Sequence, residues 1–320
     1  MSRVVFMGTP NFAVPSLQAV AAHHDVVLCL TRPDAVRSRG KKLEPSPVKV
    51  AAEQLNIPVV EANRIDDELA AQLEELQADF FCVAAYGCIL PDRILAMPKI
   101  DCINVHASLL PRWRGAAPIQ RAILADDKLA GVSIMKIGHG VDTGDYCMQD
   151  ATSVAGKSAE KLTDELAEMG ATLLLRAMEE LENNTAVWTV QDESLVTHAA
   201  KISKAELALD PALSAHVNAL RVLASSDAAP ARCMLAAKPA RVMSVRELDE
   251  VEDADVLTGL SELEGGFGEA DLVKFRKRIY LGCAQGVLEL CSVKPDGKRE
   301  MDALSWAAGL HATSANWGVL

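Results

Sequence analysis

The sequence has fewer basic than acidic residues. Its 320 residues include 32 Lys and Arg against 44 Asp and Glu, so the net charge at pH 7 is -12. Because a nucleic-acid backbone attracts positively charged surfaces, this balance argues against a general nucleic-acid-binding protein. Any contact with RNA must come from a local basic patch on an otherwise acidic surface.

Paired cysteines are also missing. The chain has eight cysteines, but no two of them have the C-x-x-C spacing that is common in zinc and redox sites. Most of them lie inside apolar runs, such as residues 80–84 and 287–293. We interpret them as small buried side chains in a reducing compartment, and we expect neither disulfides nor a bound metal.

Long apolar segments are absent as well. No run of apolar residues approaches the roughly 20 residues that a membrane-spanning helix needs. Residues 1–6 pass directly into a strand-like run, without the charged and apolar leader of an exported protein. These features predict a cytoplasmic protein that has no membrane partner.

The first half of the chain alternates short apolar runs with helical patterns. The runs that we expect to form strands are residues 4–7, 26–30, 80–84, 102–105 and 132–137. Amphipathic periodicity predicts helices at residues 12–22, 66–76, 117–124 and 158–182. This alternation is typical of an α/β fold with a doubly wound, mainly parallel, Rossmann-like sheet. The first turn, residues 8–12, lacks the G-x-G-x-x-G spacing, which argues against a nicotinamide-dependent dehydrogenase.

The pattern changes after about residue 190. Residues 191–209 are only weakly periodic, and beyond them short strand-like segments are separated by turn signals. These segments are residues 232–235, 241–245, 272–275, 279–283 and 287–293. We therefore predict a first domain over residues 1–190, a linker over 191–208 and a small β-barrel or β-sandwich domain over 209–320.

Two polar residues lie at the end of a predicted strand in the first domain. Asn104 and His106 are two positions apart, so on a strand they project from the same face. In open α/β sheets, ligands bind at the carboxyl ends of the strands. A rigid strand end that carries an amide and an imidazole could hold a reacting group, although an isolated His at such a place is more often structural than catalytic.

A glycine-rich loop follows the next predicted strand. Gly138, Gly140 and Gly144 surround Asp142 in this loop. Glycines at this spacing allow a tight turn and a close approach of the backbone to a ligand. Alone, this segment is equally consistent with a plain turn, because Asp and Gly are common turn residues.

Taken together, these segments resemble the formyltransferases that use 10-formyltetrahydrofolate. The resemblance rests on Asn-x-His, then Ser-Leu-Leu-Pro-x-x-Arg-Gly, then a downstream Asp-x-Gly. It extends over most of the chain, densely over residues 1–150 and sparsely after about residue 205. Four further segments are similar to the branch of the family that formylates the methionine of initiator methionyl-tRNA. They are residues 8–13, 39–49, 85–91 and 201–204.

The resemblance implies roles for individual residues. Asn104 and His106 would stabilise the oxyanion of a tetrahedral intermediate. Asp142 would favour the charged form of His106 and assist proton transfer. No covalent intermediate is implied, so Cys102 is interpreted as a packing residue. This reading makes the first domain the catalytic domain, and the second an OB-like β-barrel that binds tRNA.

The loop between the two catalytic segments would border the folate co-substrate. In this family the loop corresponds to Ser108, Leu109, Leu110 and Pro111. The Leu110–Pro111 bond is a candidate for the cis form, which costs little before proline. Residues 86–90 and 138–144 are expected to form further walls of the folate site.

A basic segment points to tRNA as the acceptor. Residues 32–49 contain six basic and two acidic residues, a net charge of +4 on a protein of -12. Within this segment the resemblance implies that Arg39, Lys41 and Lys42 contact the end of the acceptor stem. A second basic cluster, residues 274–278, could contact the tRNA backbone or form a solvated strand edge.

The second half departs from the family. An aromatic segment is expected near residues 225–232, where this chain has Ser-Ser-Asp-Ala-Ala-Pro-Ala-Arg. Alternatives therefore stay open: formyl transfer to a sugar nucleotide or a purine precursor, hydrolysis of 10-formyltetrahydrofolate, or a non-catalytic RNA-binding module. The acidic surface disfavours the RNA-binding module, and the basic segment disfavours the others. We expect a monomer.

Overall fold

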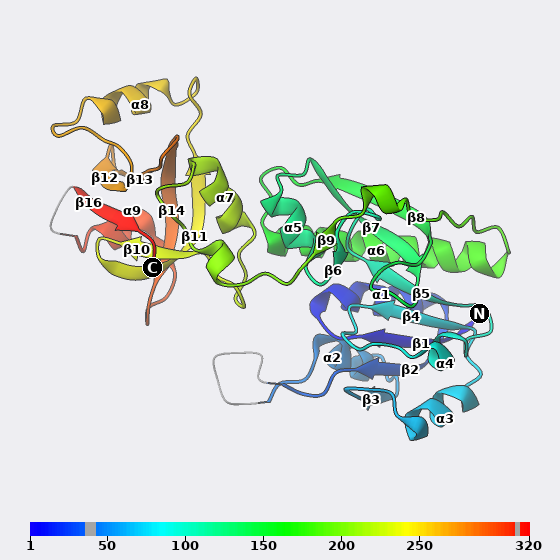
Figure 1. Ribbon diagram of the computed structural model, residues 1–320. Helices are drawn as coiled ribbons and strands as arrows, with labels where there is room; N and C mark the ends of the chain where they lie inside the picture. The colour runs from blue at the N-terminus through cyan, green and yellow to red at the C-terminus, as the bar shows by residue number, and fades with distance from the viewer. Residues whose placement is uncertain (36–42, 311–313) are drawn as a thin grey trace. The chain divides into compact units, whose positions relative to one another are not determined.

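The computed structural model describes residues 1–35, 43–310 and 314–320. The described chain divides into two compact units (Figure 1). The first consists of Met1–Ile119, Lys128–Ser153 and Lys161–Ala200, and the second of Gln120–Asp127, Val154–Glu160 and Lys201–Leu320. The main boundary therefore follows Ala200, inside the predicted linker. Over the described ranges, no helix is long and apolar enough to cross a membrane.

A mixed sheet forms the centre of the first unit. In the described part of the chain its seven strands lie in the order β3 (Val59–Glu61), β2 (Asp25–Thr31), β1 (Arg3–Gly8), β4 (Phe80–Ala84), β5 (Asp101–His106), β7 (Leu129–Lys136) and β8 (Tyr146–Ser153). Strands β3 to β5 are parallel, whereas β7 runs antiparallel to β5 and β8 antiparallel to β7. The predicted mainly parallel α/β sheet is confirmed.

Helices cover both faces of this sheet. On one face, Leu69 and Leu73 of α3 (Asp67–Glu75) and Ile94 of α4 (Asp92–Leu95) share a core with β4 and β5. On the other, α6 (Ala159–Glu182) packs so closely that a Cβ at Gly170 would lie 2.7 Å from Val105 of β5. The remaining helices of the fold's first half are α1 (Val14–His23), α2 (Pro47–Gln54) and α5 (Pro118–Leu124).

The second unit is a closed antiparallel barrel. Within the described residues its six strands follow the order β11 (Lys238–Glu247), β10 (Arg232–Leu235), β16 (Ser314–Gly318), β12 (Asp271–Phe275), β13 (Arg278–Gly282) and β14 (Val287–Pro295). Pairing of β14 with β11 closes the ring, and β15 (Met301–Asp302) extends β14. The structure thus selects a barrel over a sandwich. Helices α7 (Ala215–Leu223), α8 (Ala254–Ser261) and α9 (Ala303–Ala307) accompany it.

A histidine on α7 links separate segments of this unit. The Nδ1 atom of His216 lies 2.9 Å from a carboxylate oxygen of Glu247, and its Nε2 atom lies 3.1 Å from Asp126. Carboxylates accept hydrogen bonds, so a ring that is protonated on both nitrogens satisfies both contacts. The hydrogen bond to Glu247 is the main cause that raises the pKa of His216, partly opposed by desolvation.

This geometry predicts a pH-dependent contribution to stability. Because the folded-state pKa is raised, the contribution is fully present below the unfolded value of about 6.5 and is lost as the pH rises through the folded value. We expect His216→Ala to lower the midpoint of thermal unfolding at pH 6 and to approach the wild type at pH 9. The ring is 48% exposed, so water screens the pairs and the effect should stay below about 1 kcal/mol. An equal loss at both pH values would contradict this account.

Candidate active site

Strand β5 positions the polar pair. Along β5, Cys102, Asn104 and His106 alternate with Ile103 and Val105, so the two groups face opposite sides of the sheet. Cys102 belongs to the core under α3 and α4, which places the Asn104 and His106 side chains on that face. His106 is the last residue of the strand, at the carboxyl end of the parallel part of the sheet.

The imidazole of His106 lies between two oxygen atoms. Its Nε2 atom is 3.1 Å from the carbonyl oxygen of Trp113, and its Nδ1 atom is 3.6 Å from Oδ2 of Asp142. A carbonyl can only accept, so Nε2 carries the hydrogen and donates it to Trp113. The Asp142 contact is longer than a direct hydrogen bond, and it is an ion pair when the imidazole is protonated. Both side chains are well shielded, with exposed fractions of 7% and 19%.

The glycine-rich loop brings Asp142 to this position. Asp142 has a φ of 52°, in the left-handed region that non-glycine residues seldom adopt. Its Oδ2 atom accepts a 2.9 Å hydrogen bond from the backbone amide of Gly115. At Gly144 a Cβ would lie 2.0 Å from the carbonyl oxygen of Lys136, so this position must stay without a side chain. The loop therefore turns tightly at the end of β7, and it places the Asp142 carboxylate near His106 of β5.

The amide of Asn104 is available to a ligand. The residue is half-buried, and over residues 1–35, 43–310 and 314–320 its side chain makes no hydrogen bond. A partly buried amide usually pairs with protein or water. It therefore provides a donor beside His106 that can meet a developing negative charge.

The loop after β5 is held by a hydrogen-bond network that sequence reasoning missed. The Leu110–Pro111 bond is cis, as expected. The hydroxyl of Ser133 donates to the carbonyl of Ser108 at 2.6 Å and accepts from the backbone amide of Leu110 at 3.1 Å. The amide of Gln149 donates to the Leu110 carbonyl at 2.9 Å. A serine within an apolar strand gives no sequence signal for this role.

Two neighbouring loops expose large apolar side chains. The ring of His139 in the 138–144 loop lies 3.0 Å from the carboxylate of Asp92, which follows the 86–90 segment. Ile89 is 93% exposed and Val141 is 72% exposed. Exposed apolar side chains around a small set of polar groups suit an apolar ring with polar edges, such as a pterin.

The 86–90 segment is anchored from the strands behind it. The hydroxyl of Thr9 donates to the Tyr86 carbonyl at 2.9 Å, and the guanidinium of Arg32 donates to the Gly87 carbonyl at 2.7 Å. Gly87 has a φ of 80°, which a side chain would strain. Arg32, the first basic residue of the 32–49 segment, therefore supports this loop.

The cysteine nearest to the site is not a nucleophile. The side chain of Cys102 is buried among apolar residues, and this burial raises the pKa of its thiol to about 12. A thiol that stays protonated at neutral pH attacks poorly. The burial of Cys102 therefore favours its interpretation as a packing residue.

The structure describes only part of the basic segment at residues 32–49. Arg39, Lys41 and Lys42 lie outside the described residues. The ammonium of Lys49 pairs with Asp34 and Glu61 at 3.0 and 2.9 Å, so its charge is compensated within the protein.

The second basic cluster forms ion pairs within its own unit. Arg276 pairs with Asp255, and Arg278 pairs with Glu289. Among the described residues, Lys274 and Lys277 of this cluster have no ion-pair partner, so their charge is available to an outside phosphate.

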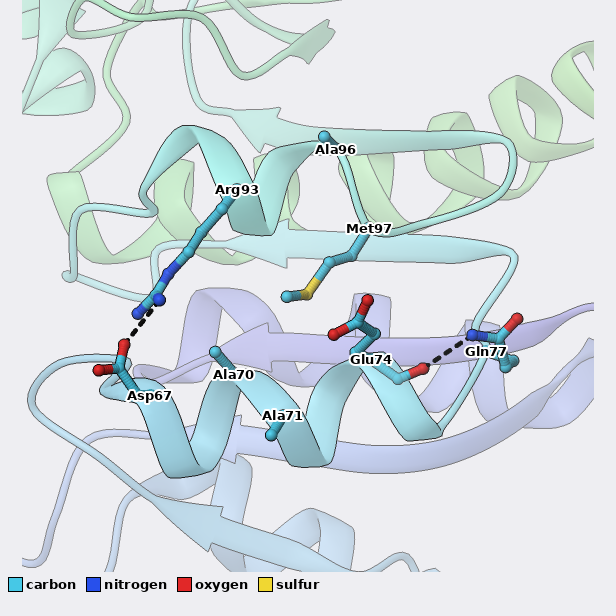
Figure 2. A pocket seen from close by; sticks show the side chains of 8 residues that line it. All are labelled: Asp67, Ala70, Ala71, Glu74, Gln77, Arg93, Ala96 and Met97. Atoms are coloured by element: carbon cyan, nitrogen blue, oxygen red, sulfur yellow. Dashed lines mark hydrogen bonds and ion pairs between the residues drawn. The ribbon is translucent and has the colours of Figure 1, made fainter.

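A surface pocket of about 460 Å³ lies elsewhere in the first unit, between α3 and α4 (Figure 2). Figure 2 shows Arg93 pairing with Asp67 at one end and Glu74 on the opposite side. Small side chains such as Ala70 form much of its lining. It contains none of the predicted site residues.

Comparison with known proteins identifies the family and relatives of similar fold. A model of the formyl transferase family matches residues 2–178. The structure resembles WlaRD, a sugar 3N-formyl transferase solved with dTDP and 5-N-formyl-tetrahydrofolate, with a TM-score of 0.65 and 16% identity over 93% of this chain and 99% of that one. An N-formyltransferase from Helicobacter canadensis, solved with folinic acid and dTDP-3-aminofucose, gives a TM-score of 0.62 and 14% identity, covering 92% and 100% of the two chains.

A third similar structure belongs to a longer protein. HypX from Aquifex aeolicus, solved with tetrahydrofolic acid, gives a TM-score of 0.61 and 14% identity over 96% of this chain, and the match covers 47% of HypX. At such identities these likenesses establish the shared fold, whereas the family match covers more than half of the sequence. The chain therefore belongs to the formyl transferase family.

Proposed function

We propose that this protein transfers the formyl group of 10-formyltetrahydrofolate to the α-amino group of methionine on initiator methionyl-tRNA, for translation initiation. The observation that carries the reaction is the position of His106 between Trp113 and Asp142, with Asn104 on the same strand face. These residues can serve an acyl transfer that needs no metal and no covalent enzyme intermediate.

The chemistry follows from these residues. The neutral amine attacks the formyl carbon, a new C–N bond forms, and the former carbonyl oxygen gains negative charge. Asn104 and the charged His106 would donate to this oxygen, His106 through Nδ1 because Nε2 is engaged by the Trp113 carbonyl. One such pre-placed donor is often worth about 3 kcal/mol. The bond to N10 of the folate then breaks, and that nitrogen takes up the proton that the amine loses. Asp142 would assist this proton transfer and stabilise the charged imidazole.

Folate as the formyl donor is supported by the relatives of similar fold and by the loops that carry or neighbour Asn104, His106 and Asp142. Structures of similar fold hold formylated or reduced folates. In this chain the apolar side chains Ile89, in the 86–90 segment, and Val141, next to Asp142 in the sequence, are exposed. The loop after β5 would also border the pterin, through Ser108, Leu109, Leu110 and Pro111. Hydrogen bonds from Ser133 and Gln149 hold this loop in place. These residues fit the folate as co-substrate.

The charge of the basic segment supports tRNA as the acceptor of the formyl group. A net charge of +4 over residues 32–49 contrasts with -12 for the whole chain. Such a segment favours a polyanion over a small neutral amine. Arg39, Lys41 and Lys42 would contact the acceptor end of the tRNA, and the barrel domain over residues 209–320 would bind its backbone.

A sugar nucleotide is the second candidate acceptor. It is favoured by the likeness to WlaRD and to the Helicobacter canadensis enzyme, which extends over nearly the whole of each chain. An amino sugar on a nucleoside diphosphate also presents a primary amine beside negative charge. The two acceptors differ in size and in the number of phosphates, so they can be separated by experiment.

A single assay tests the acceptor. The protein is incubated with 10-formyltetrahydrofolate and with charged initiator methionyl-tRNA, with dTDP-3-aminofucose, or with buffer alone. We expect formyl-methionine in the first reaction, at a rate at least about 100-fold above the other two, because the basic segment contributes only with tRNA. Formylated sugar would instead support the second candidate, and formate released in buffer would indicate a hydrolase. His106→Ala protein serves as the control in each reaction.

A further inference from the structure

Gln191 is a buried polar residue whose amide is fully engaged near the active site. It is 5% exposed and lies in the segment that the sequence suggested as a linker. Its Nε2 atom donates to the carbonyl of Asp142 at 2.9 Å and to the carbonyl of Gly144 at 2.6 Å. Its Oε1 atom accepts from Nε of Arg114 at 2.9 Å. One amide therefore binds the loop that carries Asp142.

The orientation of this amide is determined by its partners. Both loop carbonyls can only accept hydrogen bonds, and the guanidinium of Arg114 can only donate. A flipped amide would place oxygen against two carbonyl oxygens and nitrogen against a cation. Arg114, itself 5% exposed, is held from its other end by Glu193. The hydrogen bonds of Gln191 thus connect the loop to the buried guanidinium of Arg114.

The loop needs such support. Asp142 adopts a φ of 52°, and backbone strain of this kind persists only where surrounding contacts enforce it. The carbonyls that Gln191 binds flank Thr143, so they hold both sides of the loop tip. If they were released, the loop could relax and carry the Asp142 carboxylate away from His106 and from the Gly115 amide.

The same segment also holds the other partner of His106. Residues 191–199, which we name the strap, pair with the loop after β5 through β6 (Arg114–Gly115) and β9 (His198–Ala199). The hydroxyl of Thr197 accepts from the backbone amide of Trp113 at 2.9 Å, and the Thr197 carbonyl accepts from that of Arg114 at 2.9 Å. The carbonyl of Trp113 is the acceptor for His106.

We infer that Gln191 is a positioning residue for formyl transfer, which acts by holding Asp142 against His106, and that the strap as a whole keeps both oxygen partners of His106 in place. The inference rests on the proposed catalytic role of Asp142. Gln191 touches the backbone of the loop and acts on the reaction through Asp142.

The test is the substitution Gln191→Glu. A carboxylate keeps the acceptor for Arg114 but has no hydrogen for the loop carbonyls, so it breaks only the loop side of the network. We expect kcat for methionyl-tRNA formylation to fall by about 100-fold, since a displacement of about 1 Å can have this effect. The KM for methionyl-tRNA should change less than about threefold, because the hydrogen bonds of Gln191 go to the 138–144 loop and to Arg114, none of which is a proposed tRNA contact. Amides of residues 138–144 should exchange hydrogen faster, a readout that needs no activity.

The matched control is Glu193→Gln, which removes the exposed charge partner of Arg114 and leaves the loop contacts intact. Its kcat should stay within about twofold of the wild type, because the Glu193 side chain is 76% exposed and the oxygen of a glutamine can still accept from Arg114. Unchanged kcat and unchanged exchange in Gln191→Glu would overturn the inference, even where Asp142→Asn is inactive.

A double-mutant cycle separates positioning from general structural damage. In an Asp142→Asn background, Gln191→Glu should lower kcat by less than about threefold, because its target is already lost. A full additional 100-fold loss would mean that Gln191 acts by another route. If Asp142→Asn alone retains normal turnover, the proposed role of Asp142 fails first, and the inference fails with it. These outcomes can be told apart from the kinetics of the single variants.

Discussion

Replacing His106 or Asp142 with Ala should lower kcat for formyl transfer by at least about 10³-fold. The expectation combines general acid–base catalysis, typically 10²- to 10⁴-fold, with the loss of a charge or donor aimed at the oxyanion. The imidazole and the carboxylate face each other at 3.6 Å in a site that is largely closed to water. Each removal therefore affects the partner as well, and the two losses should not add.

The measurement is single-turnover formylation with saturating folate. Asp142→Asn is the more conservative variant, because an amide oxygen can still accept from the backbone of Gly115, so the loop should keep its place. Cys102→Ala is the matched control: it changes a buried neighbour on the same strand, and kcat should remain within about twofold because the reaction does not use this thiol. Near-normal turnover of either catalytic variant would refute the assignment of roles.

Removal of three charges from the basic segment should separate tRNA from small acceptors. In the combined variant Arg39→Ala, Lys41→Ala, Lys42→Ala, we expect kcat/KM for methionyl-tRNA to fall by roughly 30- to 100-fold at about 0.15 M salt. The dependence of log kcat/KM on log salt should become shallower by about 2, since each contact to a single strand contributes roughly 0.7. The KM for the folate should not change.

A second triple variant controls for net charge. Arg64, Lys99 and Lys128 are exposed basic residues of the first unit outside the segment. Their combined replacement with Ala changes the charge of the protein by the same amount, and we expect it to lower kcat/KM for tRNA by less than about threefold. Equal losses in the two triple variants would show that long-range charge alone acts, and the segment would no longer be assigned as the tRNA contact.

Local apolar patterns were sufficient to predict most of the sheet in the first unit. The run at residues 80–84 became β4 with the same bounds, because a strand buried on both faces is apolar at nearly every position. Strand β8 was missed for the opposite reason. Tyr146–Ser153 lies at the edge of the sheet, its side chains are half-buried or exposed, and its sequence shows no alternation of apolar and polar residues.

In the barrel, too, the apolar strands were predicted and a strand of weak apolar pattern was missed. Short apolar segments were predicted as strands, including residues 232–235, whose bounds agree with β10. Strand β16, Ser314–Gly318, has only one fully buried large side chain, Trp317, whose indole donates to the carbonyl of Gly282. Only its pairing with β10 and β12 identifies it as a strand of the barrel.

For the candidate site, the local sequence was sufficient to predict which side chains lie together on one strand face and in one tight loop. The two-residue spacing of Asn104 and His106 places them on one strand face, and the glycines around Asp142 permit a tight loop. Both properties depend on the chain near the residue, and local geometry is readable from a single sequence.

The long-range hydrogen bonds that hold these groups together can be seen only in the tertiary structure. The contact of Gln191 with Asp142 spans 49 residues of sequence, and that with Arg114 spans 77. A glutamine in a weakly periodic segment, like a serine in an apolar strand, gives no local sign that its amide or hydroxyl will meet a backbone carbonyl. Hydrogen bonds of this kind form only after the strands and the strap have been packed, because the buried polar groups must then find partners within the protein.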